Sequence, residues 1–235
     1  MLRACTICGR KQEFSYTAND PRDSGACHGC GGQLKEREAA HALLSWCGEG
    51  RFVSLASFAR AVEGAGDVGP GILDVCYSSP FAQQLNLLPG YQQGYFWPSG
   101  TAETTRSGDT VPFVDLQNTP YDNASFDVVL THDSLPFIED IDRALIEISR
   151  ILRPGGVCIS IVKVDWPLPD VTIELEGSEA SKPYQAPDGS TWPIRRRIGA
   201  DFANKLRAHG LQPMFRRLSF FLETRRNYTI IGLKP

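Results

Sequence analysis

The apolar positions of residues 122–164 follow a strand pattern, then a helix pattern, then a strand pattern again. Phe126 to Thr131 is a short apolar run behind a polar, turn-like tetrad, which is typical of a buried parallel strand. From Ile138 to Leu152 the apolar residues recur at a spacing of three to four, which predicts a helix with one apolar face. Pro154-Gly155-Gly156 ends that helix, and the apolar run from Val157 to Val164 predicts a second strand. The order strand, helix, strand indicates a βαβ unit.

The rest of the chain continues the same two patterns. We expect helices at Leu34 to Trp46, Leu55 to Glu63, Pro80 to Leu88 and Gly199 to His209, and strands at Ile72 to Cys76, Tyr91 to Trp97, Val111 to Leu116, Pro213 to Leu222 and Tyr228 to Leu233. A glycine-rich stretch, Gly64 to Gly71, has the composition of a linker. These patterns predict an α/β domain over residues 71–235, preceded by a helical connector over residues 35–70.

Two cysteine pairs stand ahead of the connector. Cys5 and Cys8 form the first C-x2-C motif, Cys27 and Cys30 form the second, and 18 residues separate the pairs. This spacing predicts a zinc site in which each pair of thiolates approaches the ion from one tight turn. Four thiolates fill the tetrahedral sphere, so the metal would be structural. A redox function, which needs only one such pair, is the alternative. We therefore expect residues 1–34 to form a zinc-binding module.

Composition restricts where the protein can work. The chain of 235 residues is 42% hydrophobic, which is ordinary for a globular protein, and no run approaches the ~18 apolar residues of a membrane helix. The N-terminus lacks the apolar core of a secretory signal. We therefore expect a cytoplasmic protein that does not enter membranes.

The positive charge of the chain gathers at its C-terminal end. Residues 195–235 hold ten Lys and Arg against two Asp and Glu, a local net charge of +8 in a chain whose total is −3. Such a basic end favours an anionic partner, for example nucleic acid or a phosphorylated glycan. A solvated face of arginines is the alternative.

Three motifs of the main domain resemble one superfamily. They are FDVVLTHDSLPFIEDIDRALIEISRILRPGG from Phe126, VDLQNTPYDNASFD from Val114, and RRIGADF from Arg196. From about Gly71 to Lys234 the chain resembles the class I S-adenosylmethionine (SAM) dependent methyltransferases, and within them a group with an N-terminal four-cysteine module. The resemblance implies a Rossmann-like sheet of seven strands whose last hairpin is antiparallel. It also implies SAM and structural zinc as cofactors.

The resemblance further implies a set of site residues at the carboxyl ends of the strands. The residues expected at the cofactor are Asp74, Tyr77, Ser78, Asp115, Leu116, Thr131 and His132. Asp115 would accept a hydrogen bond from the exocyclic amine of adenine. His132 and Asp133 stand where a catalytic base for the acceptor would lie.

The chain departs from the family pattern at three places. Cys76 to Pro80 contains no glycine where the family has a glycine-rich loop, and Gly94 to Pro98 offers no carboxylate for the ribose. Leu135-Pro136-Phe137 stands where the family commonly has Leu-Glu-His. These departures make a non-catalytic, methyltransferase-like partner protein one alternative to an enzyme.

The leading hypothesis is a methyltransferase that acts at oxygen on a small-molecule or glycan-linked acceptor, with an anionic acceptor favoured by the basic C-terminal end. Residues 163–197, which include Trp166, Tyr184 and Trp192 among several prolines, would form a lid over that acceptor. A nucleic-acid methyltransferase is the second alternative, although three acidic residues of the zinc module offset its four basic ones. The sequence does not define an oligomeric state.

Overall fold

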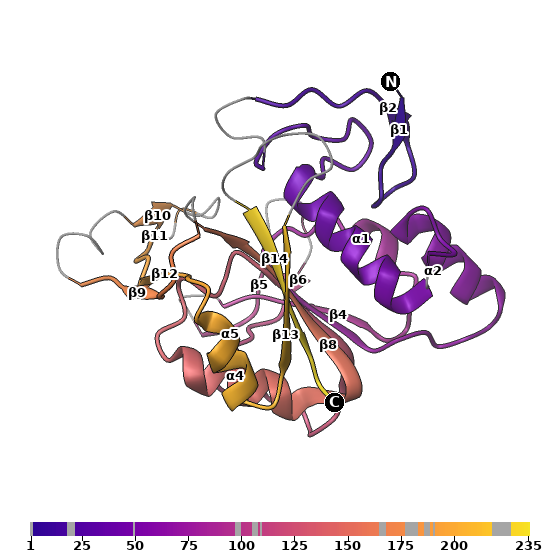
Figure 1. The fold of residues 1–235 in the computed structure, drawn as a ribbon. Coiled ribbons are helices and arrows are strands. Elements are labelled where there is room, and N and C mark those ends of the chain that lie inside the picture. The colour runs from indigo at the N-terminus through magenta and orange to yellow at the C-terminus, as the bar shows by residue number, and fades with distance from the viewer. Residues whose placement is uncertain are drawn as a thin grey trace.

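The computed structural model describes residues 2–17, 22–48, 50–96, 100–104, 108, 110–164, 168–176, 183–185, 189, 191–217 and 227–235. At its centre is a mixed sheet with the strand order β13-β14-β8-β7-β3-β4 (Figure 1). The strands are β3 Ile72–Val75, β4 Tyr91–Gly94, β7 Phe126–His132, β8 Leu152–Lys163, β13 Gln212–Arg217 and β14 Asn227–Leu233. Strands β4, β3, β7 and β8 run parallel, and β14 lies antiparallel between β8 and β13. This order confirms the predicted Rossmann-like sheet with its antiparallel final hairpin.

The seventh strand is reduced to a single bridge. The run Val111 to Leu116, predicted as a strand, contributes one parallel bridge between Phe113 and Tyr95, just beyond β4. The amide of Tyr95 donates to the carbonyl of Pro112 at 3.0 Å, but Pro112 has no N–H with which to continue a ladder. Within the described ranges the sheet therefore has six strands and one bridge instead of seven strands.

Helices cover the sheet on both faces: α1 Leu34–Gly48, α2 Leu55–Gly64, α3 Ala82–Leu85, α4 Ile141–Ile151 and α5 Phe202–Ala208. Helix α4 begins later than predicted because the Asp140 side chain accepts a hydrogen bond from the Arg143 amide at 3.0 Å and caps it. It ends at Ile151, and β8 starts at the next residue. Pro154-Gly155-Gly156 therefore lies inside β8 and does not itself end the helix.

The two faces of the sheet bury different helices. Ile72, Val128 and Leu130 point into a core shared with α1, α2 and α3, whereas Leu73 and Val129 point into a core shared with α4 and α5. Neighbouring strand residues thus alternate between the layers, as the pleat requires. Figure 1 shows α1 and α2 on one side of the sheet and α4 and α5 on the other. The helical connector predicted over residues 35–70 supplies the first of these layers.

Among the described residues, four short ladders lie outside the sheet. They are β1 Arg3–Ala4 with β2 Lys11–Gln12, β5 Glu103–Thr104 with β6 Thr110–Val111, β9 Ile173–Glu174 with β12 Arg196–Arg197, and β10 Tyr184–Gln185 with β11 Thr191–Trp192. The first belongs to the N-terminal module, and the last two belong to the segment predicted as a lid. In the part of the chain that is described, no helix combines the length and the apolar character needed to cross a membrane.

Gly94 provides a test of how the bridge is held. A Cβ atom at this position would lie 2.4 Å from Cγ2 of Val114, which is buried. We expect Gly94→Ala to lower the free energy of unfolding by about 2 kcal/mol, because Val114 must move within a packed core. Gly64→Ala is the matched control, since a Cβ there meets nothing within 4 Å. Chemical denaturation of both variants checks the prediction, and equal stabilities would contradict it.

Candidate functional site

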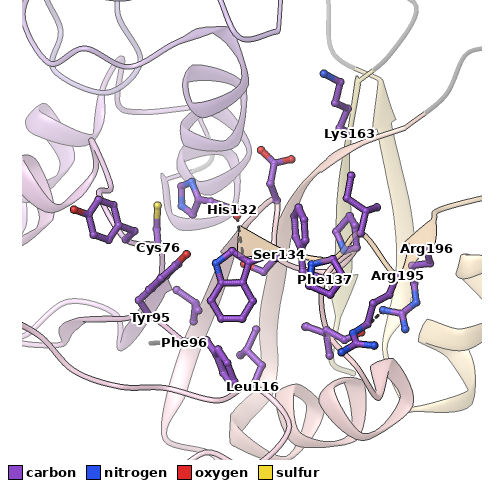
Figure 2. A pocket seen from close by; sticks show the side chains of 18 of the residues that line it. Cys76, Tyr95, Phe96, Leu116, His132, Ser134, Phe137, Lys163, Arg195 and Arg196 are labelled. Carbon is purple, nitrogen blue, oxygen red and sulfur yellow. Dashed lines mark hydrogen bonds between the residues drawn. The ribbon is translucent and has the colours of Figure 1, made fainter. Parts of the chain in front are cut away.

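The main cavity opens at the carboxyl ends of the parallel strands. The chain runs from β3 outward to β4 and later returns to β7 on the other side of β3, so the strand order reverses between β3 and β7. Ligands of open α/β sheets bind at such switch points. The cavity has a volume of about 980 Å³, at the upper end of the ~300–1,000 Å³ range of ligand sites. Cys76 and Tyr95 lie on one side of it, and Phe137 and Arg195 lie on the other (Figure 2).

The loop after β3 closes the cavity with side chains. The amide of Cys76 donates to the carbonyl of Gly94 at 2.9 Å, which anchors the loop to the end of β4. Tyr77 and Ser78 line the cavity, and the Tyr77 ring packs edge-on against Tyr95 with centroids 5.7 Å apart. A ligand here would meet aromatic rings and hydroxyl groups, where a glycine loop would offer bare backbone.

His132 and Asp74 form a buried pair beneath the cavity. His132 ends β7, Asp74 lies in the neighbouring β3, and their side chains are 8% and 0% exposed. Nε2 of His132 is 3.0 Å from Oδ1 of Asp74, close enough for an ion pair but not aligned as a hydrogen bond. The other oxygen of Asp74 accepts a hydrogen bond from the Tyr91 hydroxyl at 2.7 Å. The carboxylate is thus held between an imidazole and a phenol.

His132 is positioned to act on a ligand. Burial alone lowers its pKa, but the contact with Asp74 and the negative charges of Asp74, Glu36 and Asp133 together outweigh burial and raise the pKa above the ordinary value. Nε2 faces Asp74, which leaves Nδ1 as the nitrogen that can meet a ligand in the cavity that His132 lines. The Phe81 ring supports the imidazole from the side, with centroids 5.2 Å apart. An imidazole oriented by a carboxylate is the arrangement of a general base.

Asp133 is held by two cations from the N-terminal part of the chain. The Arg22 guanidinium contacts Oδ1 of Asp133, and Nζ of Lys35 is 3.3 Å from Oδ2. Burial alone would raise the pKa of Asp133, but Arg22 and Lys35 outweigh burial and lower that pKa. Asp133 therefore stays ionised at neutral pH, and its carboxylate belongs to an ion-pair network in the cavity wall.

The remaining predicted residues lie at the same cavity or directly below it. Asp115 and Leu116 line it, and Oδ1 of Asp115 already accepts hydrogen bonds from the backbone amide of Gln117 at 2.8 Å and from its side chain at 3.1 Å. Thr131 is fully buried and donates to Oγ of Ser160 at 2.8 Å. It therefore lies beneath the surface that a ligand would meet, whereas the sequence placed it facing the methyl donor.

One wall of the cavity consists of residues that the sequence analysis did not connect with the site. Arg22, Asp23, Lys35 and Glu36 line it from the N-terminal cysteine module and the start of α1. They belong to no motif, and no spacing relates them to His132. Their position follows from the way α1 packs across the sheet, which brings the preceding residues to the carboxyl edge.

The opposite wall comes from the predicted lid. Residues 191–197 line the cavity, and Arg196 anchors them, because its buried guanidinium donates to the carbonyls of Leu135 at 3.0 Å and Ile138 at 2.5 Å. Its Nε also lies 3.0 Å from Oε1 of Glu174. Trp166 lies outside the described residues, as does the side chain of Tyr184.

The four predicted metal ligands come together. The sulfur atoms of Cys5 and Cys30 are 3.8 Å apart, those of Cys8 and Cys27 are 3.5 Å apart, and all four lie within 4.8 Å of one another. Thiolates around tetrahedral zinc, with Zn–S of ~2.3 Å, would be about 3.8 Å apart. The chemistry and spacing of this cluster therefore fit zinc.

The two cysteine knuckles share one backbone geometry. The amide of Gly9 donates to the carbonyl of Cys5 at 2.8 Å, and the amide of Gly31 donates to the carbonyl of Cys27 at 2.8 Å. Gly9 and Gly31 have φ of 81° and 74°, a conformation that glycine adopts without strain. The glycines after the second cysteine of each pair thus let both turns direct their thiolates at one point.

Comparisons with known proteins found a family match over part of the chain and several similar solved structures. Residues 101–160 match the family model described as a methyltransferase domain. Similar solved structures include a SAM-dependent methyltransferase from Methanosarcina mazei (14% identity, covering 70% of this chain and 92% of that chain, TM-score 0.45). A second is a SAM-dependent methyltransferase from Mesorhizobium loti (14% identity, covering 77% of this chain and 100% of that chain, TM-score 0.46). Another is the 1,6-didemethyltoxoflavin-N1-methyltransferase of Burkholderia thailandensis, solved with 1,6-didemethyltoxoflavin and S-adenosylhomocysteine. It shares 18% identity with this chain, the match covers 84% of this chain and 87% of that chain, and the TM-score is 0.45. The strand order and the family match together confirm the predicted resemblance to class I methyltransferases.

The cysteine cluster can be tested by metal analysis. We expect freshly purified, unchelated protein to hold about one zinc ion per chain. Cys27→Ser should lose the metal and destabilise the protein, because metal binding supplies much of the folding free energy of so small a module. Cys158→Ser changes a buried thiol outside the cluster and should keep its zinc. A wild-type protein without metal would rule the site out.

Proposed function

We propose that this protein is a SAM-dependent methyltransferase that methylates a hydroxyl group of a small-molecule or glycan-linked acceptor. The observation that carries the proposal is His132, a cavity-lining imidazole at the end of β7 whose Nε2 faces the buried Asp74 at 3.0 Å. The position of the cavity, at the switch point of the sheet, supports a nucleoside cofactor as its second occupant.

The residues around the cavity fit SAM in a modified form of the usual site. Tyr77 and Ser78 offer hydroxyl groups to its polar parts, and Asp115 and Leu116 are placed to frame the adenine. Phe96, which follows β4 and is 37% exposed, would pack against the ribose where the family has a carboxylate. When bound, SAM supplies a methyl group attached to a positively charged sulfur.

His132 would remove the proton from the acceptor. Nδ1 of His132 would accept the hydroxyl proton of the acceptor, and SAM, when bound, would supply the methyl group that replaces that proton. Asp74 favours the tautomer with its proton on Nε2 and stabilises the imidazolium that forms, and Tyr91 holds Asp74 in place. In-line positioning supplies much of the rate of such a reaction, and a general base adds about 10²- to 10⁴-fold.

The far wall of the cavity favours a ring-shaped, anionic acceptor. Phe137 and Trp192 line it with aromatic surface. Lys163, Arg195 and Arg197 also line it, and Nη2 of Arg195 lies 3.6 Å from Oε2 of Glu139 in the same lining. Aromatic side chains pack against planar or saturated rings, and the cations would attract a carboxylate or phosphate of the acceptor.

Contacts of the basic C-terminal end favour this acceptor over nucleic acid. Nζ of Lys205 is 2.8 Å from Asp142, and Nζ of Lys234 donates to the carbonyls of Ser149 and Leu152 at 2.7 Å. These cations are used within the protein, so they add little to a basic surface for the phosphates of a nucleic acid.

Cofactor binding tests the proposal directly. We expect SAM and S-adenosylhomocysteine to bind the zinc-loaded protein with micromolar affinity in calorimetric titrations, which is an ordinary affinity for a cofactor site. If neither ligand binds near millimolar concentration, the hypothesis of an enzyme is wrong and that of a non-catalytic partner protein takes its place. If SAM binds, the acceptor can be identified by measuring which of a panel of hydroxylated aromatic and sugar acids leads to the formation of S-adenosylhomocysteine.

The general base can be tested by pH dependence. Because Asp74 raises the pKa of His132, the ring should titrate above ~6.5 by NMR, and kcat/KM should rise with pH through that same pKa. Asp74→Asn removes the raising charge, so the titration should move to lower pH. His132→Gln should lower kcat about 100-fold or more.

Matched controls exist elsewhere in the chain. His209 also faces a carboxylate, with Nε2 2.9 Å from Asp142, but it is not part of the cavity lining. His209→Gln and Asp142→Asn should therefore leave the pH profile unchanged. An unaltered pH profile in Asp74→Asn would exclude a catalytic pair of His132 and Asp74.

A further inference from the structure

Arg22 links the zinc module to the reacting end of β7. Its guanidinium is 3% exposed, contacts Asp133 across 111 positions of the chain, and lies 3.0 Å from Asp23. Lys35 completes the group, with Nζ 2.7 Å from Asp23 and 3.3 Å from Asp133. Glu36 also contacts Lys35, with Oε1 3.7 Å from Nζ. These two cations and three carboxylates form one cluster that we name the wall cluster.

The wall cluster holds the residue next to His132 in an unusual conformation. Asp133 has a φ of 56°, in the left-handed region that costs a non-glycine residue ~1–2 kcal/mol. Its amide donates to the carbonyl of Ile161 at 2.9 Å, and its carboxylate meets Arg22 and Lys35. These contacts fix the direction in which the chain leaves β7, and therefore fix His132 relative to the cavity.

The wall cluster is also tied to the second cysteine knuckle. The amide of Leu34 donates to the carbonyl of Ser24 at 3.1 Å, and the Gln33 side chain donates to the carbonyl of Asp23 at 3.0 Å. Arg37, which is buried, donates to the carbonyls of Gly25 and of Gly32. These hydrogen bonds join the segment that carries Arg22, before the knuckle, to the residues that follow the knuckle.

A contribution to stability alone does not explain these charges. A buried ion pair repays little more than its own desolvation, and an apolar pair of the same shape often stabilises a fold as well or better. The wall cluster lines the reaction cavity, and one of its carboxylates adjoins the proposed base. A role in positioning the residues of the active site explains the presence of these charges better than stability does.

We infer that the zinc module is a wall of the active site, with Arg22 as a positioning residue that fixes Asp133 and thereby His132. The inference rests on the proposed function. It follows that zinc and the cofactor stabilise each other's sites, because both require the same wall, and coupling between two sites is reciprocal.

The test compares zinc-loaded wild type with Arg22→Met, which removes the charge while keeping much of the side-chain length. S-adenosylhomocysteine should bind Arg22→Met about tenfold more weakly than it binds the wild type. Bound S-adenosylhomocysteine should also slow the release of zinc to a chelator several-fold in the wild type, but not in Arg22→Met. The pH dependence of kcat/KM should move to higher pH in Arg22→Met, because the charge of Asp133 then acts on His132 without its main counter-charge. Arg22→Lys should recover part of each effect.

Two further variants separate position from general damage. Asp142→Asn breaks ion pairs with Lys205 and His209 between α4 and α5, and it should change none of these readouts. Asp133→Asn added to Arg22→Met should weaken binding little further, since both changes remove one shared contact. Should Arg22→Met fail to fold, Lys35→Met carries the same comparison at a more exposed position of the cluster.

The outcomes are distinct. Equal affinity and equal zinc release in wild type and Arg22→Met, in a protein that binds S-adenosylhomocysteine, would overturn the role of Arg22 and leave the proposed function standing. A wild-type protein that binds neither SAM nor S-adenosylhomocysteine would overturn both.

Discussion

The burial of both faces of the central parallel sheet is the constraint on which the rest of the structure depends. Parallel strands need cover on each side, because both faces are apolar. One face is covered by α4 and α5, which follow in the second half of the chain, and the other by α1 and α2, which precede the first sheet strand. The N-terminal segment therefore shares a core with the sheet, and the residues just before α1 lie at the carboxyl edge of the sheet.

Charges concentrate at that edge in two separate groups. Asp74 is fully buried and is balanced by His132 and Tyr91, while Asp133 is balanced by Arg22 and Lys35. Asp74 lies in β3 and Asp133 directly follows the neighbouring β7, so each carboxylate would raise the energy of the other if left unpaired. Pairing gives them different surroundings: Asp74 faces the imidazole of His132 and raises its pKa, whereas the pKa of Asp133 is lowered by Arg22 and Lys35 in the cavity wall.

The family motifs explain which helices and strands surround this site better than they explain which side chains contact one another in it. The strand–helix–strand pattern of residues 122–164 predicted β7, α4 and β8, and the cysteine spacing predicted the cluster that the structure brings together. The strand predicted over Val111 to Leu116 did not form, because Pro112 has no N–H with which to continue the ladder. In the described residues the sheet has six strands and one bridge where seven strands were predicted. His132 and Asp133 could be proposed from their place after a strand. Their partners could not, because Asp74 and Arg22 are distant in sequence and belong to no shared motif.

The sequence by itself determined the classes of structure: an α/β sheet with a terminal antiparallel hairpin, a four-cysteine module, and a resemblance to class I methyltransferases. These depend on local periodicity and on short spacings, which are properties of neighbouring residues. Only the tertiary structure decided that Thr131 lies beneath the cavity, that Asp74 faces His132, and that Arg22 forms part of the wall. Those relations are set by strand pairing and by the packing of α1 on the sheet, which act between residues far apart in the chain.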